Sequence, residues 1–96
     1  MMCMSVPKKH LKDLYALFAS VETEQEAAQL LSDILTPQEI ESVAERWQIV
    51  QGLARDIPQR EVAAKLGVSI SKVTRGSRML QYGSGGFRRF LGKVVG

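Results

Sequence analysis

Apolar residues recur every three or four positions along nearly the whole chain, which is the spacing of one face of an α-helix. No alternating run of apolar and polar residues reaches the length of a strand, and no internal repeat is present. The pattern therefore predicts an all-α fold of helices joined by short links. We expect six helices, over about residues 7–20, 23–34, 36–55, 58–66, 69–80 and 86–95.

Capping residues mark several of these helix boundaries. Ser5 can cap the first helix, and Pro7 suits a first turn because its missing N–H would be unpaired there anyway. Thr23-Glu24-Gln25-Glu26 and Thr36-Pro37-Gln38-Glu39 both have the capping-box pattern, so each predicts a helix start. The third helix should end ahead of Pro58, because the residue before a proline disfavours the helical conformation.

The apolar stripes of these helices are the candidate core. The first helix carries Leu11, Leu14, Tyr15, Leu17, Phe18 and Val21 largely on one face. The stripe of the third helix consists of Ile40, Val43, Ala44, Trp47, Val50 and Ala54. A large aromatic on such a stripe more often fills the core than mimics a ligand, so we expect Trp47 to be a packing residue.

Residues 59–78 have the features of a helix-turn-helix. Ala63 is small where the second helix crosses the first, Gly67 can adopt the left-handed turn conformation, and Ser69 can cap the second helix. The residues expected to point inward are Val62, Leu66, Val68 and Val73. A plain helical hairpin would account for Gly67 but not for the small residue, the inward set and the basic flank together.

The length of 96 residues fits a single helical domain over residues 1–96. About 45% of the residues are hydrophobic and only 6% are aromatic, so the core of so short a chain is thin. Self-association would relieve this shortage of buried surface. We expect dimerisation helices over 1–57, the helix-turn-helix over 58–80 and a C-terminal helix over 83–96.

Charge is divided unevenly along the chain. Residues 1–57 carry 5 basic and 9 acidic residues, whereas residues 58–96 carry 8 basic residues and a single acidic one, Glu61. A basic C-terminal portion suits a polyanion such as nucleic acid, although an unevenly charged solvated surface accounts for the numbers equally well. Residues 22–45 contain seven acidic residues and no basic one, and should face away from any nucleic acid.

Several function classes lose support at this point. With one cysteine, Cys3, and one histidine, His10, the sequence has neither a disulfide framework nor a metal-ligand pattern. No apolar run approaches the roughly 20 residues that span a bilayer, and no signal-peptide core is present. Gly83-Ser84-Gly85-Gly86 lacks the lysine of a phosphate loop, and no nucleophile has a base partner. We expect a cytoplasmic protein that is not an enzyme and has no metal, cofactor or membrane partner.

A helix-turn-helix that reads double-stranded DNA inserts the N-terminal end of its second helix into the major groove. Lys72 could reach guanine acceptors there, Ile70 could touch a thymine methyl group, and Arg60 could meet phosphate. The candidate DNA-binding residues are Gln59, Arg60, Ala63, Ser69, Ile70, Ser71, Lys72 and Thr74. The alternative is a helical protein-interaction module without specific DNA binding, which a thin core and a dimeric layout would also suit.

Four motifs together resemble the Trp repressor family: Leu35-Thr36-Pro37, Arg46, Gln59-Arg60-Glu61 and Thr74-Arg75-Gly76-Ser77. The resemblance covers about residues 30–82 at the level of motifs. The tail Tyr82-Gly83-Ser84-Gly85-Gly86-Phe87 is similar to that of one branch of Trp-repressor-like regulators.

That family is itself a standard example of helix-turn-helix docking, so the geometry expected here is its known one. The resemblance implies a six-helix fold and an interlaced homodimer, with two reading heads roughly 34 Å apart on operator DNA. It implies a sequence-specific DNA-binding transcriptional regulator, a repressor of the Trp repressor type.

The resemblance also implies a corepressor, L-tryptophan, beside the reading head. Its indole would lie between Arg46 and Arg75, and its carboxylate would meet Arg75 and Thr36. The backbone carbonyl of Leu35 would meet the ligand amine, and Gly76 completes the candidate set. Helical periodicity alone would instead place Arg75 with Lys72 and Arg78 on one basic stripe facing phosphate.

This sequence departs from the family pattern at three places. Met79 stands where the repressor has a serine that helps to hold the ligand amine. Asp33 replaces a usual leucine, and the link before Gln59 is one residue shorter.

Overall fold

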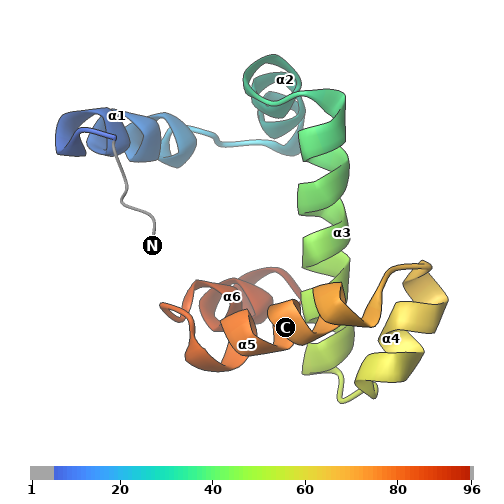
Figure 1. The fold of residues 1–96 in the computed structure, drawn as a ribbon. Helices are drawn as coiled ribbons and strands as arrows, with labels where there is room; N and C mark the ends of the chain where they lie inside the picture. Colours follow the sequence, from blue (N-terminus) through green and yellow to red (C-terminus); the bar gives the residue numbers. More distant parts are fainter. Residues whose placement is uncertain (1–5, 96) are drawn as a thin grey trace. The chain divides into compact units, whose positions relative to one another are not determined.

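The computed structural model of the chain describes residues 6–95, which form helices and no strand (Figure 1). The elements are α1 (Lys8–Ala19), α2 (Glu24–Ile34), α3 (Pro37–Ala54), α4 (Gln59–Leu66), α5 (Ile70–Tyr82), α6 (Gly86–Phe90) and the π-helical turn η1 (Leu91–Val95). The all-α prediction is confirmed, and the predicted helix boundaries agree with the observed ones to within about two residues. The last predicted helix is divided into α6 and η1.

The chain forms two compact units, the first ending at Thr36 and the second beginning at Pro37. The first unit contains α1 and α2, and the second contains the remaining elements. Among residues 6–36 no residue is buried, and the apolar side chains of Leu14, Leu17 and Phe18 on α1 are exposed. The first unit therefore has no core of its own within the described chain.

The caps of two helices follow the predicted chemistry. Thr23 Oγ1 accepts a hydrogen bond from the backbone N–H of Glu26 at 3.1 Å, and Ser69 Oγ accepts one from Lys72 at 3.3 Å. The Glu26 carboxylate reaches back to the N–H of Glu22 at 2.9 Å, one residue earlier than the usual capping box. Pro7 occupies the N-cap position of α1 and not its first turn, while Ser5 lies outside the described residues.

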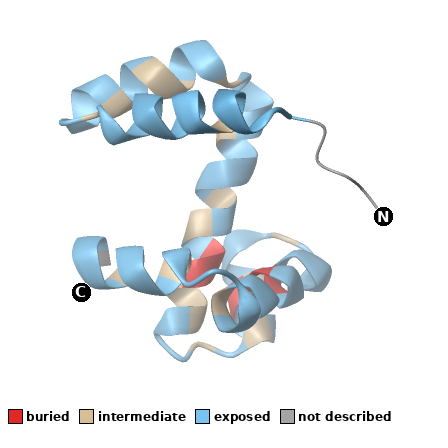
Figure 2. Cartoon of the chain, turned by 90° about the vertical axis from the view of Figure 1, so that its left-hand side faces the viewer, coloured by how far each residue is buried: buried red, intermediate tan, exposed pale blue. Residues whose placement is uncertain are grey.

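The core of the second unit lies where α3 meets α4 and α5, and Figure 2 shows the buried residues gathered there. Ile49 of α3, Val62 of α4 and Val73 of α5 form one buried cluster, and Val50 of α3 is also fully buried. The half-buried residues packed against the cluster are Leu53, Ile57, Ala63 and Val68. The helix-turn-helix is thus held together by α3.

The predicted inward set was wrong at Leu66, whose side chain is 38% exposed. Val62 and Val73 are buried and Val68 packs against the core, as predicted. Figure 1 shows α4 leaving α3 as it runs toward the turn before α5. Leu66 is the last residue of α4, so it lies beyond the crossing, and Val68 takes its place after the turn.

The predicted stripe of α3 was also incomplete. It included Val50 but omitted Ile49, which is central to the core, and it included Val43 and Ala54, which are exposed. A single stripe serves a helix that packs on one side. The C-terminal half of α3 packs against both α4 and α5, so its buried residues span two adjacent faces.

Two glycines allow the three helices to approach closely. A Cβ atom at Gly52 would lie 3.1 Å from Val62 Cγ2, where α3 meets α4. A Cβ atom at Gly76 would lie 2.8 Å from Ile49 Cγ2, where α5 crosses α3, and real Cβ atoms essentially never come so near. Gly67, with φ of 67°, serves a different purpose, because it supplies the left-handed conformation at the turn between α4 and α5.

We expect Gly76→Ala to lower the free energy of unfolding by about 1–3 kcal/mol, because the added methyl group overpacks a closed core. Chemical denaturation followed by circular dichroism measures this change. Gly92→Ala is the matched control, since a Cβ at Gly92 meets nothing within 4 Å. Equal stability of the two variants would contradict the close crossing of α3 and α5.

Candidate nucleic-acid interface and ligand pocket

The helix-turn-helix presents most of its candidate DNA-binding residues to solvent. Arg60 near the start of α4, and Ile70, Ser71, Lys72 and Thr74 on the first turns of α5, are exposed. They belong to the two helices that a helix-turn-helix brings against DNA. The exposed side chains therefore include one apolar group, two hydroxyls and two cations, which is a set that can read base edges and phosphates.

The other three candidates, Gln59, Ser69 and Ala63, make contacts within the chain. Thr74 Oγ1 donates a hydrogen bond to Gln59 Oε1 at 3.0 Å, which connects the start of α4 to α5. Ser69 Oγ caps α5, and half-buried Ala63 packs against the core as its small size predicted. These residues help to position α5 whether or not they also touch DNA.

Lys72 makes an ion pair that no sequence pattern indicated. Its Nζ atom lies 2.9 Å from Oε1 of Glu45 on α3, and the two side chains are 59% and 29% exposed. The sequence predicts for Glu45 only a place in the acidic stretch 22–45, which should face away from nucleic acid. Instead, Glu45 contacts the helix that carries the candidate DNA-binding residues. The contact joins residues 27 positions apart, so helical spacing contains no signal for it.

A cavity of about 350 Å³ adjoins this ion pair, and we call it the charged pocket. It is lined by Ser42, Glu45, Arg46, Ile49, Lys72, Arg75, Gly76, Met79 and Phe87. Three residues of the predicted ligand set, Arg46, Arg75 and Gly76, meet here. Both arginines therefore border one cavity, and Glu45 lines it as well. Gly76 is also the point of closest approach between α5 and α3.

The other two predicted ligand residues lie in the first unit. Leu35 is the C-cap of α2, and its N–H donates to the carbonyl of Leu31 at 3.0 Å. Thr36 is the last residue of that unit. Their roles in a ligand site stay predictions.

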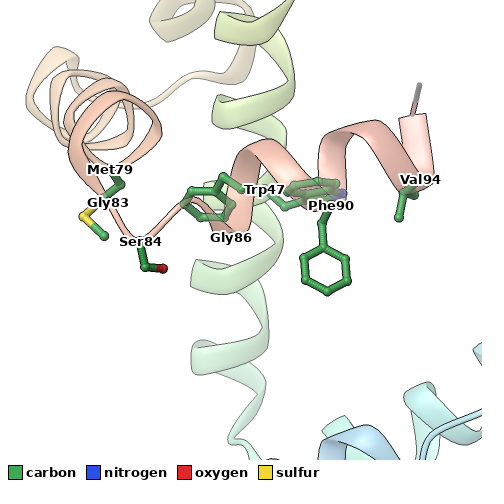
Figure 3. A pocket seen from close by; sticks show the side chains of 8 residues that line it. Trp47, Met79, Gly83, Ser84, Gly86, Phe90 and Val94 are labelled. Atoms are coloured by element: carbon green, nitrogen blue, oxygen red, sulfur yellow. The ribbon is translucent and has the colours of Figure 1, made fainter.

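A second, more apolar cavity of about 500 Å³ lies beside the charged pocket, and we call it the apolar pocket (Figure 3). It is lined by Trp47, Met79, Gly83, Ser84, Gly86, Phe87, Phe90 and Val94. Trp47 stacks on Phe87 with ring centroids 6.2 Å apart, so it packs against α6 and is only half buried. Met79 and Phe87 border both pockets. In the sequence, Met79 stood out only because it replaces a serine of the family pattern. In the structure it lies between the two pockets and lines both of them.

The C-terminal elements are tied to α5 by a hydrogen bond. Arg88 Nε donates to the backbone carbonyl of Leu80 at 3.0 Å. Together with the Trp47–Phe87 stack, this bond attaches α6 to both α5 and α3.

The described residues contain neither a candidate metal site nor a candidate membrane span. No group of three or more His, Cys, Asp or Glu residues within 6–95 could hold a metal ion. None of the helices in that range is long and apolar enough to cross a membrane.

Comparison with known proteins gives a consistent set of relatives. A family model described as Trp repressor protein matches residues 9–95. A Trp operon repressor homolog of Chlamydia caviae is 40% identical over 80 residues, which covers 82% of this chain and 79% of the relative. A Trp operon repressor homolog of Chlamydia trachomatis serovar L2 is 34% identical over 96 residues, which covers 98% of this chain and 85% of the relative. A Trp operon repressor homolog of Mannheimia succiniciproducens is 43% identical over 65 residues, which covers 67% of this chain and 64% of the relative. No solved structure matches the chain significantly.

Phe87→Ala should lower the free energy of unfolding by roughly 1–2 kcal/mol, less than for a fully buried aromatic, because Phe87 is half buried. It should also shift the fluorescence of Trp47, the only tryptophan of the chain, to longer wavelengths as water reaches the indole. Tyr82→Ala is the control, since Tyr82 is 81% exposed and lines neither pocket. An unchanged emission spectrum for Phe87→Ala would contradict the stacked pair.

Proposed function

We propose that this chain, which belongs to the Trp repressor family, represses transcription as a homodimer that places α5 in the major groove of operator DNA. DNA-binding repression is the function of the family. The observation that carries the proposal is the helix-turn-helix formed by α4, the left-handed Gly67 and α5, with an exposed polar first turn on α5. We propose no catalytic role. A role on DNA agrees with the cytoplasmic location expected from the sequence.

The proposed DNA contacts divide by their chemistry. Arg60 and Lys72 are the two cations among the candidate DNA-binding residues, and both are exposed. They would contact phosphates or guanine acceptors. Ile70, Ser71 and Thr74 would face base edges or sugar groups. Gln59, Ala63 and Ser69 would contribute mainly by positioning, because their side chains already contact Thr74, the core and the start of α5. Affinity would then depend on the cations, and sequence preference on the other exposed side chains.

A homodimer is supported by the surface of α1. Its Leu14, Leu17 and Phe18 are 39%, 40% and 46% exposed, although they lie on the apolar face of the helix. Such surface is stabilised when a second subunit covers it. Because residues 6–36 bury no side chain, a partner would supply the core that this unit lacks.

The charged pocket supports control by a small aromatic amino acid, with L-tryptophan as the candidate corepressor. A planar guanidinium can stack on an aromatic ring and also bind a carboxylate, so Arg46 and Arg75 suit both ends of such a ligand. The cavity is in the size range of small-molecule sites. We propose Arg46, Arg75 and Gly76 as ligand-binding residues. Leu35 and Thr36 are the further ligand-binding candidates that the family resemblance implies.

Arg60→Ala should weaken binding to a selected operator by about tenfold, because it removes a charge-assisted contact. The slope of log K against log salt concentration should fall by about one. DNA is first selected from a random pool, and affinity is then measured by fluorescence anisotropy at several salt concentrations.

Lys12→Ala is the matched control, since it removes a cation from exposed α1 in the first unit and should change neither quantity. Equal losses in both variants would contradict docking through the helix-turn-helix. A pool that yields no sequence bound more tightly than random DNA would contradict specific binding altogether.

Titration calorimetry with L-tryptophan should give saturable heat, which Arg46→Ala and Arg75→Ala should each weaken at least tenfold by removing a guanidinium from the pocket. Arg78→Ala is the matched control, because Arg78 lies on α5 but does not line the pocket. Wild-type affinity in the two pocket variants would refute this use of the cavity.

A further inference from the structure

Glu45 occupies a position that connects two proposed sites. Glu45 lines the charged pocket, and its carboxylate pairs with Lys72, whose Nζ is 2.9 Å away. Lys72 belongs to the first turn of the reading helix and lines the same pocket. Glu45 therefore borders both the space for a ligand and the ammonium group of a proposed DNA contact.

The ion pair with Glu45 restrains Lys72. An ammonium group held by Glu45 must leave that carboxylate before it can approach a phosphate or a guanine acceptor. The side chain of Glu45 is only 29% exposed, so water screens it less than a fully exposed carboxylate. Lys72 must therefore exchange the Glu45 carboxylate for a group on DNA when DNA binds. Its contribution to DNA affinity is reduced by the free energy of the ion pair with Glu45.

The charges lining the pocket indicate what could release Lys72. Its lining includes three cations, Arg46, Lys72 and Arg75, and a single carboxylate, Glu45. A ligand carboxylate would be drawn to the guanidinium groups. Glu45 is then the one charged group left to receive a ligand ammonium, and Met79 on the same wall offers no hydroxyl for that purpose.

We propose that Glu45 is a switch that couples the charged pocket to DNA binding. Glu45 holds Lys72 through the ion pair, and the ammonium group of an amino-acid ligand takes the place of Lys72 on the carboxylate. The released Lys72 then contacts DNA, so that ligand and DNA strengthen each other's binding. The inference rests on the proposed function, because it assumes that α5 reads DNA.

The first test measures the affinity of ligand-free protein for the selected operator. Glu45→Gln keeps the shape of the side chain but removes its charge, and should raise affinity by about two- to tenfold. Glu61→Gln is the matched control, because Glu61 also pairs with a lysine, Lys65, at 3.7 Å on the helix-turn-helix. Its effect reports the general loss of negative charge, and should be smaller than that of Glu45→Gln.

The second test asks whether the gain passes through Lys72. In a Lys72→Met background, Glu45→Gln should raise DNA affinity no more than Glu61→Gln does in the wild type. A general field effect would instead persist when Lys72 is absent. Thermal melts of every variant establish that each is folded at the assay temperature.

The third test concerns the ligand and uses L-tryptophan and indole-3-propionate, which lacks the ammonium group. L-Tryptophan should raise the operator affinity of the wild type several-fold more than indole-3-propionate does. In Glu45→Gln the preference for L-tryptophan should shrink several-fold, because only uncharged acceptors such as the Leu35 carbonyl would remain for the ammonium group. An undiminished preference for L-tryptophan in Glu45→Gln, or no effect of either compound on the wild type, would overturn the ligand step.

Failure of the switch and failure of the proposed function have different outcomes. If the wild type binds the selected operator but Glu45→Gln and Glu61→Gln behave alike, the switch is wrong and DNA reading stands. If no sequence is bound more tightly than random DNA by any variant, the proposed function fails and the switch fails with it.

Discussion

The close crossing of α3 with α4 and α5 is the constraint on which the rest of the second unit depends. Ile49, Val62 and Val73 exclude water together there, and Gly76 allows α5 to approach Ile49 more closely than any other residue could. With so few buried side chains, this contact fixes the angle at which the helix-turn-helix stands on α3. It also determines which residues of α3 lie beside α5, and therefore the composition of the charged pocket.

Local chemistry made much of the fold predictable. The capping boxes, Pro58 and Gly67 act within a few residues of themselves, so the helix boundaries followed from the sequence. The core was less predictable, because α3 packs on two sides and its inner residues cannot be separated by a single periodicity. Ile49 was missed for this reason, and Leu66 was wrongly placed because the path of α4 past the crossing is a tertiary property.

The candidate site likewise has features that could be predicted and others that depend on tertiary structure. That Arg46 and Arg75 would border one cavity was implied by resemblance, since helical spacing alone aimed Arg75 at phosphate. The pairing of Glu45 with Lys72 had no signal of either kind, because both residues looked like ordinary members of an acidic and a basic stretch. Charge counts describe segments, whereas an ion pair depends on which segments the core brings together. The acidic segment of residues 1–57 thus contributes a carboxylate to a pocket that three cations also line.

The arrangement on α5 explains why ligand and DNA would be coupled over so short a distance. Lys72 and Arg75 are three positions apart and line the same cavity, so one turn of helix bears both a proposed DNA contact and a proposed ligand contact. No movement of a domain is needed to connect them, because a charged side chain that changes partners is enough. Coupling of this kind requires a carboxylate with two possible cationic partners and a core rigid enough to keep it in reach of both. Glu45 already pairs with Lys72, and the close approach at Ile49 and Gly76 sets α3 and α5 against each other beside it.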